Sequence, residues 1–155
     1  MVLQIDNSLD DKDWQILKLL QQNARLSYAE LSRSVGLSRP TVIERIRRLE
    51  EIDAITGYQA RVNPRQVGLP ILAFMRLTVT GTDYGHVVKA IQNIPDVLEC
   101  HCITGNDCYI LKVAVPSIES LEKLIKRLTP YGSLVTSVIL SSPVENSVVQ
   151  SPTEK

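Results

Sequence analysis

Two helix-start signals that flank a single glycine constrain this chain most strongly. Ser27 and Glu30 have the spacing of a capping box, so a helix is predicted over residues 28–35. Gly36 follows directly, and glycine most readily adopts the left-handed backbone that ends a helix. Ser38 is then the next N-cap candidate. The pattern predicts two helices joined by a tight turn, which is typical of the helix-turn-helix motif.

The helix predicted over residues 39–51 has one apolar side and one basic side. Val42, Ile46 and Leu49 fall on a single stripe, at about 100° per residue, and polar side chains occupy the opposite side and its flanks. Glu44 is expected either to accept from a cytosine amino group or to hold an arginine in place. The candidate DNA-contacting residues are Ser38, Arg39, Thr41, Glu44, Arg45, Arg47 and Arg48.

Another helix is expected before this pair. Asp10 and Asp13 have the spacing of a capping box, and Ile16, Leu17 and Leu20 supply an apolar face. The whole chain has Lys+Arg 17 and Asp+Glu 17, so its net charge of +0 does not by itself favour nucleic-acid binding. The arginines are instead concentrated on the helix after Gly36, and this distribution favours DNA binding there.

The second half of the sequence alternates between strand and helix patterns. Strands are predicted over residues 71–80, 97–104, 109–115 and 134–140, and helices over residues 83–94 and after Ser117. This is the βαββαβ order of a ferredoxin-like domain. The predicted fold class is α+β, an N-terminal winged helix-turn-helix joined to a C-terminal ferredoxin-like domain. The expected parts are residues 1–53 for DNA binding, 54–69 for a wing or linker strand, 70–142 for the second domain, and 143–155 for a loose polar tail.

Composition argues against several classes of protein. No run of about 18 uncharged apolar residues is present, so no membrane span is expected. Residues 1–13 are acidic and lack an apolar secretion core, which predicts a cytoplasmic protein. The sequence has 3 cysteines, Cys100, Cys102 and Cys108, and an odd number is not typical of a disulfide framework. In a strand Cys100 and Cys102 point to one face and His101 to the other, so buried strand residues are favoured over a metal site, and no cofactor is expected.

An enzyme is the alternative from a different class, because ferredoxin-like dimers host small oxygenases and other activities. The chain offers only two histidines, His86 and His101, and we find no nucleophile–base pair, metal-ligand spacing or phosphate loop. Such an enzyme would also have no use for the arginine-bearing N-terminal half. We therefore expect a non-enzymatic protein, with a purely sensory or scaffolding role as a third possibility.

Residues spread over both halves carry a family resemblance. They are Leu9, Asp10, Asp13, Ile16, Leu17, residues 23–27, Glu30, Leu31, residues 35–38 and 45–51, Ile55, Gly68, Leu69, Thr104 and Gly105. In this order and spacing the chain resembles the Lrp/AsnC (leucine-responsive/asparagine, feast/famine) regulators. The resemblance implies double-stranded DNA as a partner, homodimers that assemble to tetramers or octamers, and a small amino-acid effector bound between subunits by the C-terminal module.

Two positions depart from the family pattern. Asp53 stands where the family usually has glycine after the third helix, and aspartate can adopt the same left-handed conformation at modest cost. Cys108 stands where the family hairpin usually has an acidic residue suited to a ligand ammonium group. Asp107, one position earlier, would point to the opposite face of a strand. This departure favours an alternative function, an effector-independent architectural DNA-binding protein.

The hairpin before Cys108 has two interpretations. Glycine, asparagine and aspartate suit a tight turn, and the same backbone N–H groups suit a ligand carboxylate. The candidate effector-binding residues are Thr104, Gly105, Asn106, Asp107, Cys108, Thr136 and Ser137. Nearly continuous apolar strands, as in residues 71–75, further predict that the sheet face without helices is covered by a second subunit.

Overall fold

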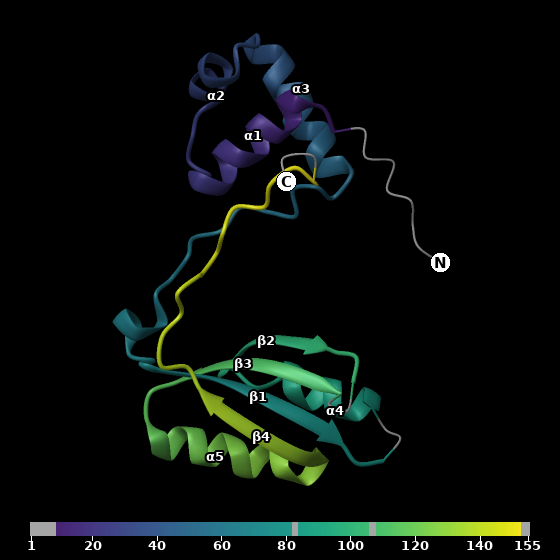
Figure 1. Cartoon of the computed structure of the whole chain (residues 1–155), viewed down its shortest axis with the longest axis vertical. Helices are drawn as coiled ribbons and strands as arrows, with labels where there is room; N and C mark the ends of the chain where they lie inside the picture. The colour runs from purple at the N-terminus through teal and green to yellow at the C-terminus, as the bar shows by residue number, and fades with distance from the viewer. Residues whose placement is uncertain (1–8, 82–83, 106–107, 153–155) are drawn as a thin grey trace. The chain divides into compact units, whose positions relative to one another are not determined.

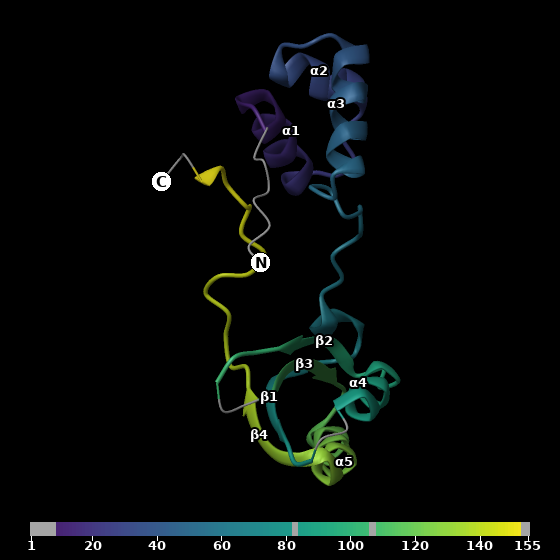
Figure 2. The same ribbon diagram turned by 90° about the vertical axis from the view of Figure 1, so that its right-hand side faces the viewer.

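The computed structural model describes residues 9–81, 84–105 and 108–152, which form two compact units. One unit comprises Met1–Ala60 with Val144–Lys155, and the other comprises Arg61–Pro143. Figures 1 and 2 show the elements from two sides. In chain order they are α1 (Asp11–Gln22), α2 (Tyr28–Val35), α3 (Arg39–Glu51), η1 (Pro64–Val67), β1 (Ile71–Val79), α4 (Tyr84–Gln92), β2 (Val97–Cys102), β3 (Tyr109–Val115), α5 (Ile118–Leu128), η2 (Thr129–Tyr131) and β4 (Gly132–Val138).

The first unit contains the three predicted helices, and each begins at its predicted cap. Asp10 and Ser27 both form complete capping boxes with the residue three positions later, and the Ser38 side chain accepts from the Thr41 N–H. Gly36 has a φ of 68°, as the helix stop requires. The apolar faces meet in a core of Ile16, Leu17, Leu31, Val35, Val42, Ile46 and Leu49.

The chain leaves α3 through a left-handed residue. Asp53 has a φ of 56°, so it adopts the conformation that glycine would supply at this position. Its N–H donates to the Glu50 carbonyl oxygen at 3.1 Å, and the Ile55 N–H donates to the Leu49 carbonyl oxygen at 3.0 Å. Ile55 then packs against the three-helix core. The aspartate therefore permits the helix end that the sequence predicts.

The stretch expected to form a wing or linker strand has no β-ladder among its described residues. Residues 56–63 have no regular secondary structure, and a 3-10 turn, η1, follows. A strand requires a hydrogen-bonded neighbour, and these residues lie outside the sheet of this chain. The wing strand is thus not formed within one copy of the chain.

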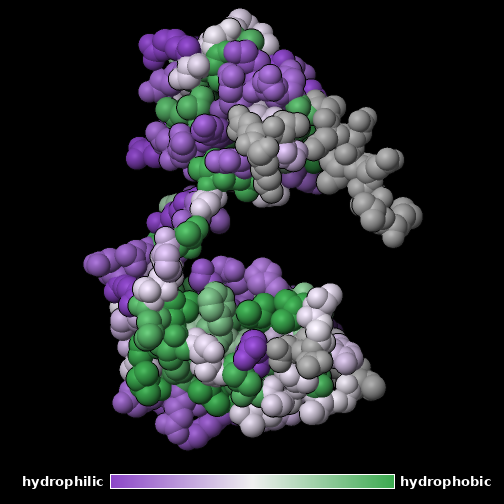
Figure 3. Space-filling model, in the orientation of Figure 1, coloured by the Kyte–Doolittle hydropathy of each residue, from purple (hydrophilic) through white to green (hydrophobic). Residues whose placement is uncertain are grey.

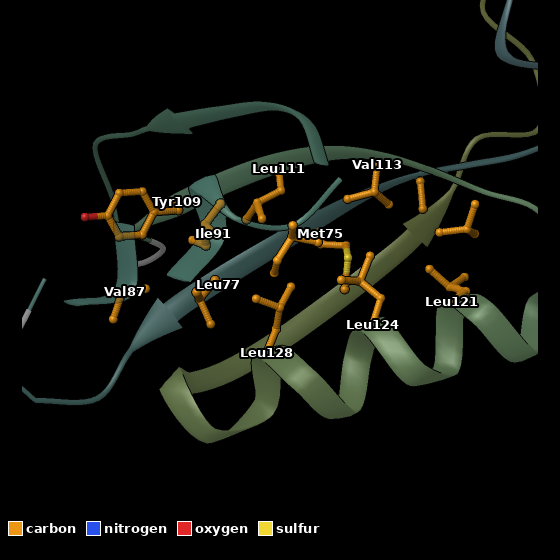
Figure 4. Packing of buried hydrophobic residues seen from close by; sticks show 13 residues of the cluster. Met75, Leu77, Val87, Ile91, Tyr109, Leu111, Val113, Leu121, Leu124 and Leu128 are labelled. Carbon is orange, nitrogen blue, oxygen red and sulfur yellow. The ribbon is translucent and has the colours of Figure 1, made fainter. Parts of the chain in front are cut away.

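The second unit is a four-stranded antiparallel sheet with strand order β2-β3-β1-β4. The central strands β1 and β3 pair from Ile71↔Val115 to Leu77↔Tyr109. Helices α4 and α5 lie on the same face of the sheet (Figures 1 and 2). Met75, Leu77 and Leu111 of that face pack against Leu124 and Leu128 of α5 (Figure 4). The predicted βαββαβ fold is confirmed, and its core lies between the sheet and the two helices.

Several element ends differ from the predictions by a few residues. Strand β2 ends at Cys102 rather than residue 104, and α4 ends at Gln92 rather than residue 94. Strand β4 begins at Gly132, two residues earlier than predicted. A Cβ atom on Gly132 would lie 2.1 Å from the Thr78 carbonyl oxygen. Only glycine permits this close approach, so Gly132 can begin the strand beside β1.

The sheet face opposite the helices is open and partly apolar. The alternating register places Phe74 on this face, between Lys112 of β3 and Ser137 of β4, and it places Arg76 between Ile110 and Val135. Phe74 and Val135 are 40% and 46% exposed. In Figure 3 hydrophobic residues cover much of this face around an isolated hydrophilic position. The strands are therefore less uniformly apolar on this face than residues 71–75 suggested.

The C-terminal tail contacts the first unit, which differs from the expectation of a loose tail. Val149 exchanges two hydrogen bonds with the Gln21 side chain of α1. Ser151 is only 7% exposed. Within the described ranges, no helix is both long and apolar enough to cross a membrane.

Candidate nucleic-acid interface and effector loop

Helix α3 is held by its buried side, which leaves the opposite side exposed. Val42, Ile46 and Leu49 are 0%, 3% and 1% exposed in the core with α1 and α2. Among the candidate contact residues, Ser38, Arg39, Thr41, Glu44 and Arg47 are exposed, and Arg45 and Arg48 are half-buried. The candidate residues therefore lie on one surface, but their side chains differ in exposure.

Arg45 is held by two carboxylates of the first helix, and we call Arg45, Asp10 and Asp13 the Arg45 cluster. The Arg45 guanidinium Nη1 donates to Asp10 Oδ2 and Asp13 Oδ1, each at 2.8 Å. The Asp13 side chain is 1% exposed, and it also accepts from the Asp10 N–H at 3.1 Å. These carboxylates, Asp13 first, raise the pKa of the guanidinium above its usual range. The cluster fixes α3 to the N-terminus of α1.

Asp10 is stabilised as an anion by the same arrangement. The backbone N–H of Asp13 donates to Asp10 Oδ1 at 2.9 Å and is the main reason that the pKa of the Asp10 carboxyl is lowered. Arg45 lowers this pKa further, and burial opposes both effects. Asp10 is therefore at once the cap of α1 and an anionic partner of α3.

Two further arginines of the basic side, Arg47 and Arg48, are held by weaker ion pairs. Arg47 Nε donates to Glu51 Oε1 at 2.9 Å, and both side chains are more than half exposed, so this pair costs little to open. Arg48 Nη1 lies 3.9 Å from Asp13 Oδ2, with its side chain 42% exposed. Arg47 is thus open to a new partner at the surface of α3, and the partly exposed Arg48 lies on the same helix.

The N-terminal turn of α3 forms a shallow polar edge beside these arginines. The Ser38 and Thr41 hydroxyl oxygens lie 2.7 Å apart, and the Thr41 N–H donates to the Ser38 hydroxyl. Pro40, Thr41, Glu44, Arg45 and Arg48 line an open depression of about 510 Å³. Ser38 is thereby engaged as the cap, and hydroxyl, carboxylate and guanidinium groups face the same solvent region.

The candidate effector residues that the structure describes do not converge on one point within a single chain. Asn106 and Asp107 lie outside the described residues. Thr104 and Gly105 are exposed, and Gly105 has a φ of 112°, as suits a turn. The Cys108 N–H donates to the Leu77 carbonyl oxygen at 3.0 Å, and its side chain packs against the core. Cys108 is therefore a small, half-buried residue that lies directly before β3.

The two effector candidates on the last strand point to opposite faces of the sheet. Thr136 pairs with Met75, whose side chain lies in the core, and Ser137 pairs with the exposed Phe74. Both pairs lie nearer the start of β1 than Leu77, whose carbonyl oxygen accepts from the hairpin residue Cys108. One chain therefore cannot bring both hydroxyl groups and the hairpin to the same small ligand.

The cysteine–histidine triplet is arranged as the alternation of a strand predicts. His101 lies across from Ile110 on the open face and its Nε2 is 3.2 Å from Glu99 Oε2, whereas Cys100 and Cys102 lie across from Leu111 and Tyr109. Both cysteines are exposed, so the expectation that they are buried is wrong. Strand β2 is an edge strand, which explains this exposure. Within the described ranges, no three His, Cys, Asp or Glu residues are grouped to hold a metal ion.

The pairing between Asp13 and Arg45 is the feature of this surface that sequence reasoning missed. Asp13 was identified only through its spacing from Asp10. It also lies three, four and seven positions before Ile16, Leu17 and Leu20, on the apolar stripe of its own helix. A carboxylate on a buried stripe requires a cationic partner. That signal was present in the sequence, although the choice of Arg45 as partner was not.

Both units match domains of known protein families. Residues 9–50 match the AsnC-type helix-turn-helix domain, and residues 72–149 match the Lrp/AsnC ligand binding domain. The chain belongs to the Lrp/AsnC family. It is a transcriptional regulator of that type, with a DNA-binding domain followed by a ligand-binding domain.

Individual relatives of this Lrp/AsnC regulator agree with the family assignment. The HTH-type transcriptional regulator LrpC of Bacillus subtilis is 38% identical over 133 residues, which are 86% of this chain and 92% of the relative. Its solved structure has a TM-score of 0.84 and covers 86% of this chain and 96% of that chain. The leucine-responsive regulatory protein of Escherichia coli is 38% identical over 76% of this chain and 73% of its own length.

A more distant structure shows the same fold. A Neisseria meningitidis transcriptional regulator in complex with L-Met has a TM-score of 0.87 at 24% identity, covering 96% of this chain and all of that chain. The domain matches and the relatives at 38% identity confirm the predicted family, and the solved structures agree with the predicted fold class.

Proposed function

We propose that the regulator binds DNA sequence-selectively through the exposed side of α3. The observation that carries this proposal is the exposed basic side of α3, opposite a fully buried aliphatic stripe. A helix held in this way can enter a major groove without moving its supporting core. Such a protein acts where the chromosome lies, in the cytoplasm, and it has no need of a catalytic site.

The arginines of α3 have different roles in this proposal. Arg39 and Arg47 are exposed and contact phosphates or guanine edges, with Thr41 and Glu44 beside them. Arg45 holds α3 in place through Asp13 instead of contacting DNA. Opening the Arg45 cluster would leave the buried Asp13 carboxylate without its main counter-charge, and this cost is larger than one phosphate contact repays.

We further propose that the functional unit is a homodimer formed by the open sheet faces, which assembles further to a tetramer or octamer. Phe74, Ile110 and Val135 give this face an apolar centre, and Arg76 and Lys112 give it charges. An antiparallel sheet with helices on one face only leaves such a surface to be covered. In a dimer, two α3 helices would reach successive major grooves roughly 34 Å apart.

An amino-acid-like effector would then bind between subunits. Thr136 and Ser137 point to opposite faces in one chain, so a site that uses the hairpin and last-strand hydroxyls requires residues from two copies. The Neisseria relative is named as an L-Met complex, which supports this ligand class. Cys108 in place of the family's usual acidic residue supports the alternative, an architectural protein without effector.

Mobility shifts in increasing salt test the DNA interface. We expect Arg47→Ala to weaken binding and to lower the slope of log K against log salt by about one, because one phosphate contact is lost. Arg127→Ala is the matched control, since Arg127 is an exposed arginine on α5 in the other unit. Equal affinity and slope for Arg47→Ala and the control would refute the interface.

Two further measurements separate the regulator from the architectural alternative. Footprinting that protects one operator supports specific regulation, whereas regular protection across unrelated sequences supports architecture. A thermal-shift series with the common amino acids tests the effector, because a ligand that binds only the folded protein raises its apparent stability with concentration. No shift with any of them would contradict effector control of this kind.

A further inference from the structure

The C-terminal tail makes a specific contact with the DNA-binding unit. The Val149 N–H donates to Gln21 Oε1 at 2.8 Å, and Gln21 Nε2 donates to the Val149 carbonyl oxygen at 3.1 Å. One side-chain amide therefore satisfies both backbone groups of one residue, as a neighbouring strand would. Gln21 lies in the last turn of α1, so the tail residue is joined to a rigid helix.

Burial along the tail fits a docked segment. Val148 is half-buried and Ser151 is 7% exposed, whereas Val144 and Val149 are 75% and 67% exposed. Before this segment, Asn146 has a φ of 55°. Asparagine is among the few residues that adopt this left-handed backbone readily, and the chain bends there. The bend and the buried positions define residues 148–151 as the docked tail.

The docked tail is joined directly to the last strand of the ligand-binding domain. Strand β4 ends at Val138, and the Ile139 N–H still donates to the Leu72 carbonyl oxygen at 2.8 Å. Residues 140–147 then lead to the docked tail. The two units are therefore connected by the chain twice, once through residues 52–70 and once through this segment. A single flexible linker leaves the two units free to adopt many relative orientations, and a second connection reduces their number.

We propose that the docked tail is a second tether that links β4 to α1 and restricts the placement of the DNA-reading helix. Its occupant is this chain's own segment, residues 148–151, bound at Gln21. Helix α1 carries the docking residue at one end and Asp13 at the other, and Asp13 is bonded to Arg45 of α3. The restraint therefore acts on the rigid body that contains α3. The functional part of this proposal rests on the proposed DNA binding.

Docking is tested by hydrogen exchange of the Val149 N–H in the full chain. Two neutral hydrogen bonds at an exposed site support a docking equilibrium of about tenfold. We expect Gln21→Ala to speed exchange of this amide by about that factor. Gln22→Ala is the matched control, because Gln22 is the exposed next residue of the same helix. Equal exchange in wild type and Gln21→Ala would overturn the docking.

The restraint on α3 is tested with DNA whose two half-sites are separated by different spacers. A spacer lengthened by roughly half a helical turn, about 5 base pairs, places the half-sites on opposite sides of the duplex. We expect the affinity penalty for this DNA to fall by up to about tenfold in Gln21→Ala and in a chain that ends at Pro143. The effect cannot exceed about tenfold, because docking can shift the orientation of the DNA-binding unit by no more than the docking equilibrium constant. Gln22→Ala should keep the wild-type penalty.

The outcomes separate the two proposals. Faster exchange of Val149 with an unchanged spacing penalty would overturn the tether while leaving DNA binding intact. If the wild type binds DNA with none of the spacers, the proposed function and the tether are both overturned. Hydrogen exchange of the Val149 N–H still decides whether the tail is docked. Protection of Val149 that grows with protein concentration would assign the docked tail to a second copy of the chain, and so would overturn docking within one chain.

Discussion

Replacing Arg45 with alanine should destabilise the three-helix unit far more than replacing Arg47. Asp13 is 1% exposed and accepts from Arg45 at 2.8 Å, so the variant leaves a buried carboxylate without its main cationic partner. Breaking a fully buried pair in this way costs about 3–5 kcal/mol. Arg45 is 24% exposed and Arg48 lies 3.9 Å from Asp13, so water and a second arginine offset part of this cost. We expect a loss of about 2–3 kcal/mol.

Urea unfolding followed by tryptophan emission measures this loss. The chain has a single tryptophan, Trp14, which lies on α1 next to Asp13 and packs against the three-helix core, so its emission reports on this unit. With a slope of about 1 kcal/mol per molar for so small a unit, the unfolding midpoint of Arg45→Ala should fall by about 2–3 M.

Arg47→Ala is the control, because its pair with Glu51 is exposed on both sides and contributes less than about 1 kcal/mol. In the double variant Arg45→Ala/Asp13→Ala, we expect part of the stability to return, since no carboxylate then remains buried without a partner. Equal midpoints for Arg45→Ala and Arg47→Ala would refute the assignment of Arg45 to a positioning role. We expect the opposite order for DNA affinity: Arg47→Ala should bind DNA weakly although its stability is unchanged.

Three other changes probe different parts of the molecule. Gly132→Ala should destabilise the sheet by about 1–3 kcal/mol, because the added Cβ meets the Thr78 carbonyl oxygen, and a thermal melt equal to wild type would contradict this close approach. Burial, and then its hydrogen bond to Glu50, raises the pKa of Tyr58 to about 12. The stability from this neutral phenol is therefore complete below its ordinary pKa of 10.0 and is lost as the pH rises through about 12, and a titration difference against Tyr58→Phe measures it. Phe74→Glu should convert dimers to monomers in light scattering at micromolar concentration, and an unchanged mass would count against the open sheet face as the interface.

The helical half of the fold is predictable from sequence because its signals are local. A capping box is a contact between residues three apart, and Gly36 and Asp53 act through their own backbone conformation. The aliphatic stripe of α3 follows from periodicity alone, and the polar side opposite it follows with it. The family, the helical unit and the choice of α3 as the proposed DNA-reading helix all depend on such short-range patterns.

The strand ends were less predictable, because the neighbour that decides them is distant in sequence. Gly132 lies two residues after a proline that follows a helix, which by itself indicates a helix stop. In the structure it pairs with Val79 of β1 and is the first residue of β4. The wing expected over residues 54–69 needs a partner strand that one chain does not supply. In both cases pairing with a segment distant in sequence decides whether a strand forms.

The sequence by itself determined which residues of α3 face outward and which form its buried stripe. Only the tertiary structure decided that Arg45 is bound by Asp10 and Asp13 while Arg47 stays exposed, because charge pairing depends on which side chains of different helices are brought within about 4 Å of each other. The same holds for the tail, where a polar segment without periodicity acquires a fixed position through Gln21. Periodicity is a property of one element, whereas a partner is chosen by the packing of two.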